Sequence, residues 1–217
     1  SEDGTVGVIV EVNCETDFVA KTDDFKALVT AIARQVAAKN PATVEELLEQ
    51  TFVDDESETI NAMLNAAVAK IGEKISIRRF ARAEGVVDTY VHLGGKIGVL
   101  VNLEVSDGVD ATAIGKDVAM QIAALNPRFW DKSQVTEDVL AEEKKIALAL
   151  MDSDPKMASK PAQVKEKIVM GKMNKFYEEN CLLQMEFVRS DLFQGTVENY
   201  IADAAKKLSL IHISEPT

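Results

Sequence analysis

A duplicated pattern constrains the fold of this chain more than any other feature of its sequence. The segment TVGVIVEVN at residues 5–13 resembles KIGVLVNLEV at residues 96–105, and both have the β-branched residues of a strand around a shared Gly-Val pair. Further along, QVAAKNP at residues 35–41 matches QIAALNP at residues 121–127. Each copy therefore predicts a strand followed by a helix that ends at Asn-Pro, because proline cannot continue a helix.

The spacing within the two copies differs, and the difference singles out one segment. Gly7 and Gly98 are 91 residues apart, whereas Gln35 and Gln121 are only 86 residues apart. The first copy thus carries five additional residues between its strand and the end of its helix, and NCETDFVAK at residues 13–21 lies in this interval. A segment that only one of two sister modules carries is more typical of a function than of packing.

The remaining pattern predicts further strands and helices. Strands are expected in both repeated segments, in KISIRRFARAEG and in VVDTYVHLGG. Helices are expected at residues 16–39 with Thr16 as N-cap, in TVEELLEQTF, in SETINAMLNAAVAKIG, and at residues 136–152 and 161–180. The short connections Glu84-Gly85 and Gly94-Gly95 predict antiparallel neighbours.

These elements predict an α+β fold of two pseudo-repeated subdomains, each a small antiparallel sheet packed with helices. The first subdomain is expected at residues 1–85 and the second at residues 86–207. Two charged helices joined by the polar segment SDPKMASK predict a protruding antiparallel helical hairpin at about residues 136–180. The final segment LSLIHISEPT, residues 208–217, reads like a translated sequencing adapter, so it and its His212 are set aside as an artefact.

Composition excludes several classes of function. The net charge is −12, so no basic excess is present to neutralise the phosphates of a nucleic acid or an anionic membrane surface. No signal peptide opens the chain, and no apolar run approaches the roughly 20 residues that a bilayer span needs. Cys14 and Cys181 are the only cysteines, too few for a disulfide framework or a zinc cage. A reducing, cytoplasmic location is expected.

Candidate chemistry is sparse. Cys14, His92 and Asp17 could in principle combine as a nucleophile, its base and an orienting acid, although a cysteine at a strand end is more often a packed side chain. No His/Cys cluster suggests a metal. HLGGKIG is rich in glycine but precedes a strand, so it does not form a phosphate-binding helix N-terminus. We therefore predict no catalytic residue, no cofactor, no metal and no small-molecule substrate.

Two side chains leave alternatives open. Phe18 stands among polar residues at the expected start of a helix, where its ring could pack back onto the helix or anchor a partner protein. His92 ends a predicted strand, where a histidine with satisfied hydrogen bonds is the plain interpretation. Neither alternative is decided by the residues alone.

At these residues the sequence resembles the translation elongation factor Ts family, whose members are exchange factors for the GTPase elongation factor Tu. EVNCETDFVAK is similar to the family signature. VAKIGEKISIRRFARAEG, YVHLGGKIGVLV and KPAQVKEKIVMGKMNKFYEENCLLQMEFV each match a family segment, in family order. The resemblance covers about residues 3–207. It implies two repeated subdomains with a helical hairpin, and a fragment that lacks the family's N-terminal helical domain and C-terminal closing strand.

The resemblance also implies a site and a function. Thr16, Asp17 and Phe18 match the intruding tip that enters beside the magnesium site of the GTPase, Ile71 and Gly72 match a contact stretch, and His92 matches a functional histidine. The implied function is promotion of GDP release from elongation factor Tu by disturbing its Mg-phosphate site, without bond chemistry. The alternatives are a truncated module that docks on the GTPase without exchange, or a cysteine-dependent hydrolase.

Overall fold

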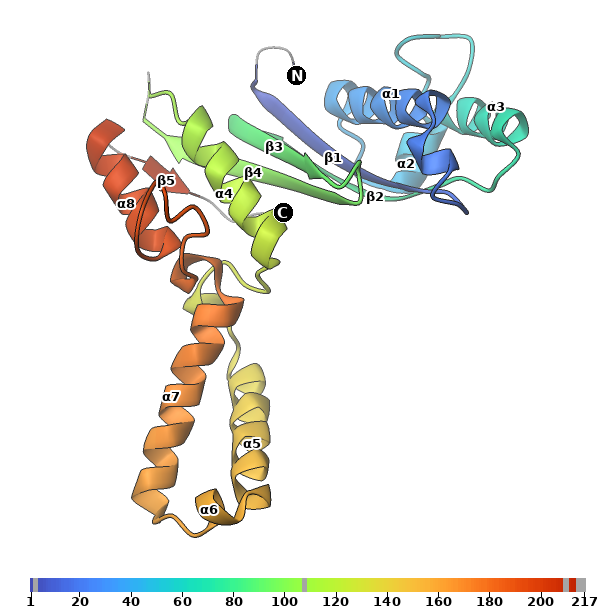
Figure 1. Cartoon of the computed structure of the whole chain (residues 1–217). Coiled ribbons are helices and arrows are strands. Elements are labelled where there is room, and N and C mark those ends of the chain that lie inside the picture. Colours follow the sequence, from blue (N-terminus) through green and yellow to red (C-terminus); the bar gives the residue numbers. More distant parts are fainter. Residues whose placement is uncertain (2–3, 107–108, 209–210, 214–217) are drawn as a thin grey trace. The chain divides into compact units, whose positions relative to one another are not determined.

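The computed structural model describes residues 1, 4–106, 109–208 and 211–213, and for the last three residues it describes the backbone alone. The chain divides into two compact units (Figure 1). The first contains residues 1–123 and the C-terminal segment from residue 210, and the second contains residues 124–209. Among the described residues, no helix is both long enough and apolar enough to cross a membrane.

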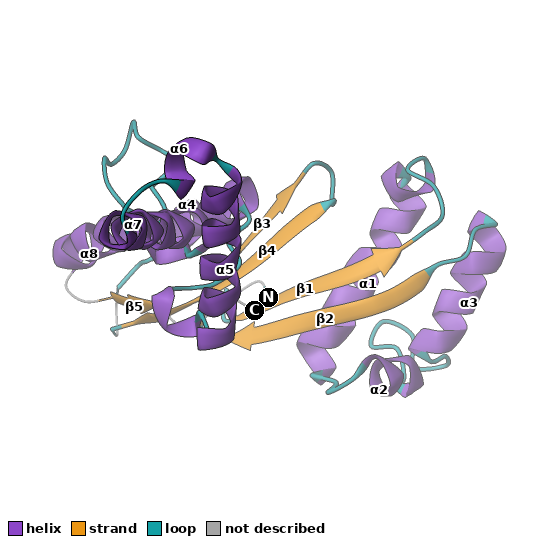
Figure 2. Cartoon of the chain, turned by 90° about the horizontal axis from the view of Figure 1, so that it is seen from below, coloured by secondary structure: helices purple, strands orange, loops and turns teal. Residues whose placement is uncertain are grey.

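A two-stranded antiparallel sheet forms the first half of the first unit. Its strands are β1 (Val6–Asn13) and β2 (Ser76–Glu84), and the helices α1 (Asp23–Lys39), α2 (Val44–Glu49) and α3 (Ile60–Ile71) pack against it (Figure 2). Every second residue of β1 faces these helices, as the period of a strand requires. The core between the sheet and the helices contains Phe25, Leu28, Ile32, Val36, Leu47, Ile60 and Ile77.

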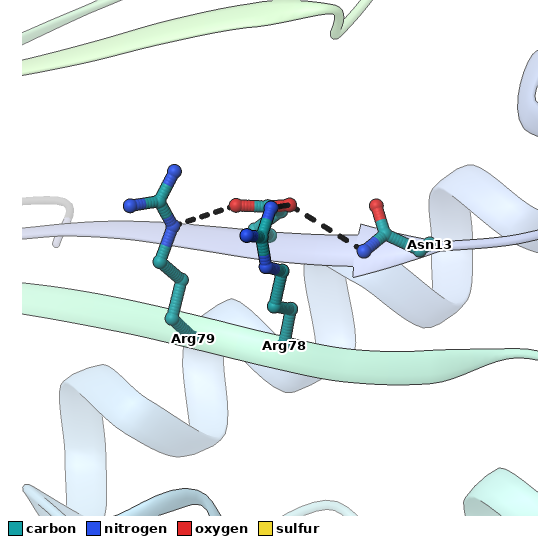
Figure 3. Close-up of polar contacts among 4 residues, drawn as sticks. Asn13, Arg78 and Arg79 are labelled. Atoms are coloured by element: carbon teal, nitrogen blue, oxygen red, sulfur yellow. Dashed lines mark hydrogen bonds and ion pairs between the residues drawn. The ribbon is translucent and has the colours of Figure 1, made fainter.

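An irregularity in this sheet creates a charge cluster. The register shifts between Glu11 and Val12, so Arg78 is the extra residue opposite β1. Neighbouring residues of a regular strand point to opposite faces, but here both Arg78 and Arg79 reach Glu11, at 2.9 Å and 2.6 Å (Figure 3). Asn13 donates a further hydrogen bond to the same carboxylate. The two guanidinium groups lower the pKa of Glu11 to about 2.

A second sheet contains β3 (Val86–His92) and β4 (Ile97–Val105), which pair antiparallel from Val86 opposite Leu103 to His92 opposite Ile97. The short strand β5 (Ile211–Ile213) pairs with the other edge of β4. The helix α4 (Thr112–Leu125) follows β4. Leu208 and β5 belong to the segment at residues 208–217 that was predicted to be a translated adapter. The other residues of this segment lie outside the described residues, and the origin of the segment stays a prediction.

The two sheets approach each other at the duplicated glycines. A Cβ atom on Gly7 would lie 2.6 Å from Leu100 Cδ1 and 3.0 Å from the Cβ of Val87. A Cβ atom on Gly98 would lie 2.7 Å from Ile9 Cδ1. The Gly-Val pair recognised in the sequence is therefore a point of close contact in both copies, and its glycine is required by space rather than by backbone conformation.

The helix ends of the duplication also correspond. Gln35 and Gln121 are both fully buried, and the carboxamide of Gln35 bonds the backbone of Thr51 and Val53. Asn40 and Asn126, each directly before a proline, both adopt left-handed backbone conformations with φ of 44° and 48°. The α+β fold with repeated sheets is thus confirmed, whereas the predicted boundary at residue 85 falls inside the first unit and stays a prediction.

Two local predictions were wrong. The helix expected at residues 16–39 begins only at Asp23, with Thr22 as its N-cap, and the short 3-10 turn η1 (Val19–Lys21) precedes it. Glu84-Gly85 was expected to join antiparallel neighbours, but β2 pairs with β1 and β3 pairs with β4. A single residue between two strands is too short for a hairpin, so Gly85, with φ of 113°, passes the chain from one sheet to the other.

The second unit contains the predicted antiparallel pair, α5 (Glu137–Ser153) and α7 (Ala162–Asn180) (Figure 1). Thr136 caps α5, and the apolar seam between the helices contains Ala147, Met151, Val169 and Met173. The unit is completed by η2 (Lys132–Gln134), α6 (Pro155–Ala158), η3 (Leu182–Gln184) and α8 (Val197–Leu208).

Candidate interaction site

The segment that only the first repeat carries forms an exposed loop after β1. We call residues 14–18 the Phe18 loop. Its last side chain, Phe18, is 84% exposed, and so its ring does not pack into the core of its own subdomain. Thr16, Asp17 and Phe18 are all exposed, and the chain re-enters the core with Val19 and Ala20. An apolar ring so exposed among polar neighbours is a typical feature of a protein-binding surface.

Hydrogen bonds join the Phe18 loop to the end of α3. The carboxylate of Glu73 accepts the backbone N–H groups of Glu15 at 3.1 Å and Thr16 at 3.0 Å, and the Thr16 hydroxyl at 2.5 Å. Glu73 directly follows Gly72, which ends α3 in a left-handed conformation with φ of 81°. Glu73, which follows Gly72 and bonds Thr16, therefore connects these two predicted residues.

Ile71 differs from the other predicted residues. It is half-buried and packs against the core between the first sheet and its helices, so part of its side chain stabilises the fold. Gly72, in contrast, is exposed, and a Cβ atom there would meet nothing within 4 Å. Its backbone conformation is the reason for glycine at this position.

An ion pair joins the Phe18 loop to the β3–β4 hairpin. Lys96 Nζ lies 3.0 Å from Asp17 Oδ2. The hydrogen bond and the positive charge of Lys96 lower the pKa of Asp17 below its ordinary value. Lys96 stands directly before β4, in the same hairpin as His92. The loop thus has partners from two different parts of the first unit.

His92 lies at the exposed end of β3. Its ring stacks on Tyr90 with centroids 5.7 Å apart, and its Nδ1 is 3.1 Å from the Tyr90 hydroxyl. Val91 and Leu93 beside it are 68% and 63% exposed. The histidine is consequently held by a neighbour yet open to solvent, which suits a contact residue as well as it suits a satisfied strand-end histidine.

Sequence reasoning missed Glu73 and Lys96. Both are charged residues beside glycines, a pattern that solvated turns share, and they stand 57 and 79 residues from the loop residues that they contact. A signal for Glu73 was its place directly after the matched Ile71-Gly72 stretch. Lys96 lies in the matched segment YVHLGGKIGVLV, but nothing in that segment indicates its contact with Asp17, which depends on the tertiary fold.

The geometry at Cys14 does not favour a nucleophile. Burial, and next the charge of Glu73, raise the pKa of the Cys14 thiol, whereas a reactive thiolate requires a lowered pKa. The protonated Sγ donates a hydrogen bond to the carbonyl of Thr16 at 3.3 Å. Within the described part of the chain, no group of three or more His, Cys, Asp or Glu side chains is placed to hold a metal ion.

Comparison with known proteins gives a consistent result. A family model described as Elongation factor TS matches residues 15–215. Elongation factor Ts of Clostridium kluyveri is 42% identical over 213 residues, covering 96% of this chain and 67% of that protein. Elongation factor Ts of Halothermothrix orenii is 41% identical over 211 residues, covering 96% and 69%. That of Trichlorobacter lovleyi is 43% identical over 213 residues, covering 94% and 67%.

Proposed function

Because the chain belongs to the elongation factor Ts family, we propose that it is a guanine nucleotide exchange factor that promotes GDP release from elongation factor Tu. The single observation that carries the proposal is the exposure of Phe18 on a loop that is held from two sides. The protein acts by binding, and the chemistry of the nucleotide is unchanged. We expect the protein to bind elongation factor Tu in the cytoplasm.

The exposed ring supplies the driving force. Transfer of a phenyl side chain from water into an apolar pocket is worth about 1.5–3 kcal/mol. In the proposed complex Phe18 enters a pocket of the GTPase between two helices near its bound magnesium. Part of this free energy then displaces the helix that orients the ion, and nucleotide affinity in such GTPases depends on the ion bridging phosphate and protein oxygens.

Linkage makes the weakening of GDP binding and of factor binding mutual. If the factor weakens the binding of GDP, then GDP weakens the binding of the factor by the same ratio. The complex of all three is therefore short-lived, and either ligand can leave it. Thr16, Asp17, Ile71, Gly72 and His92 complete the proposed contact surface around Phe18.

The proposal is tested with Phe18→Ala. Release of a fluorescent GDP analogue from elongation factor Tu is followed by stopped flow, with the circular dichroism spectrum as the check on folding. We expect the variant to stimulate release at least tenfold less than the parent chain, because the anchor ring is lost. Leu192→Ala is the matched control, since it truncates another exposed apolar side chain, in the second unit.

Unchanged GDP release by folded Phe18→Ala would contradict the anchor role. A pull-down with elongation factor Tu separates docking from exchange. A parent chain that binds the GTPase without accelerating release would support the alternative of a docking module. A chain that does both supports the proposed function.

A further inference from the structure

The loop that carries Phe18 is held by one carboxylate from a distant part of the sequence. Glu73 Oε2 accepts the N–H groups of Glu15 and Thr16, at 3.1 Å and 3.0 Å, and Glu73 Oε1 accepts the Thr16 hydroxyl at 2.5 Å. Three donors on two consecutive residues thus converge on both oxygens of one side chain. Hydrogen bonds to a carboxylate are stronger than those between neutral groups.

The contact is reciprocal. Glu15 Oε2 accepts the backbone N–H of Lys74 at 3.1 Å, so two neighbouring pairs of residues exchange side chain to backbone bonds. The same Thr16 hydroxyl that donates to Glu73 also accepts the N–H of Val19 at 3.3 Å. This bond joins Thr16 to Val19, the first residue of η1, so Phe18 lies between its two ends. The position of the ring is thus connected to Glu73 through Thr16.

The end of α3 places Glu73. The Gly72 N–H bonds the Val68 carbonyl at 2.8 Å, and the left-handed conformation of Gly72 ends the helix one residue before Glu73. Glycine permits this turn, and after it the Glu73 carboxylate lies at the loop in the free protein. Gly72 therefore serves the loop through the backbone as well as through any contact with a partner.

We propose that Glu73 is a positioning residue, which holds residues 15–18 so that the ring of Phe18 is presented in the conformation that its partner binds. This inference rests on the proposed function of Phe18. A loop without Glu73 would sample many conformations, and the entropy lost on ordering it would oppose insertion of the ring. Glu73 acts inside the protein, through its hydrogen bonds to the loop.

Glu73→Ala is the direct test, and Glu49→Ala is its matched control, because Glu49 is an exposed acidic residue on α2 and its loss changes the net charge equally. We expect Glu73→Ala to reduce stimulated GDP release about tenfold with the circular dichroism spectrum unchanged. NMR is expected to show faster exchange of the Glu15 and Thr16 amide hydrogens. Glu73→Gln keeps an oxygen for both N–H groups and is expected to restore most of the activity.

A double-mutant cycle separates positioning from a general structural effect. If Glu73 acts through the ring, Glu73→Ala has almost no further effect in a Phe18→Ala background. A full tenfold loss on top of Phe18→Ala would overturn the inference, and so would unchanged release by Glu73→Ala. If Phe18→Ala alone has no effect, the proposed function fails first. Should Glu73→Ala not fold, Glu73→Asp, which keeps the charge but shortens the reach, replaces it in the cycle.

Discussion

At the scale of single residues, Cys14 bears on whether the protein carries out bond chemistry. Its thiol has a raised pKa and donates to the Thr16 carbonyl, which are features of a packed side chain. We predict that Cys14→Ser retains stimulated GDP release within about twofold, since the serine hydroxyl can donate the same hydrogen bond. A thiol probe should label Cys14 slowly near neutral pH. Rapid labelling, together with loss of function in folded Cys14→Ser, would revive the hydrolase hypothesis.

Glu11 gives a prediction for pH. Its pKa in the folded chain is lowered by Arg78 and Arg79 to about 2, from an ordinary value of 4.5. A group with a lowered folded pKa contributes stability above its unfolded pKa, and this contribution is lost as the pH falls through the folded pKa. Glu11→Gln should therefore melt below the parent at pH 7, and the difference should shrink below about pH 4.5 and be mostly lost at about pH 2. A difference that is constant across this range would contradict the charge cluster.

At the scale of elements, the space around two glycines predicts opposite effects when each is replaced by alanine. Gly7→Ala inserts a methyl group against Leu100 and Val87 and should cost about 1–3 kcal/mol of unfolding free energy. Gly171→Ala, in α7, meets nothing within 4 Å and should gain about 0.5–1 kcal/mol from helix propensity. Urea unfolding measures both. A Gly7→Ala variant as stable as the parent would show that the sheets can separate there.

The elements themselves were largely predictable from the sequence, and the exceptions have physical reasons. β1 to β4 and the hairpin helices follow from periodicity and caps, which are local. The predicted start of α1 was wrong because the sequence pairs Thr16-Asp17 and Thr22-Asp23 are equally good signals for the start of a helix. The bonds from Glu73 to Glu15 and Thr16 hold the first of these in a loop, and these contacts are tertiary.

The candidate site was predictable in part. Its exposed members were found from the segment that one repeat lacks and from the family resemblance. Their assembly was not, because the contacts of Glu73 and Lys96 with the Phe18 loop cross 57 to 79 residues of sequence. Sequence periodicity reports which face of an element is apolar, but it carries no information on which distant turn meets which loop.

At the scale of the whole molecule, the candidate site lies within the first compact unit, and the helical hairpin belongs to the second. Met173→Ala removes a buried side chain from the seam of the hairpin and should destabilise it by about 2–5 kcal/mol. We predict a lower unfolding midpoint but GDP release within about twofold of the parent at saturating concentration of the factor. A tenfold loss of the saturating rate in the folded variant would show that the hairpin takes part in exchange.

The reciprocal glycines have a consequence for recombining such proteins. In the first repeat, the space beside Gly7 is occupied by the side chain of Leu100 from the second repeat. In the second repeat, the space beside Gly98 is occupied by the side chain of Ile9 from the first. The packing of each repeat therefore depends on a glycine and on an aliphatic side chain of the other repeat. A chimera that takes one half from another protein will fold tightly only if donor and recipient agree on both bulky side chains as well as on both glycines.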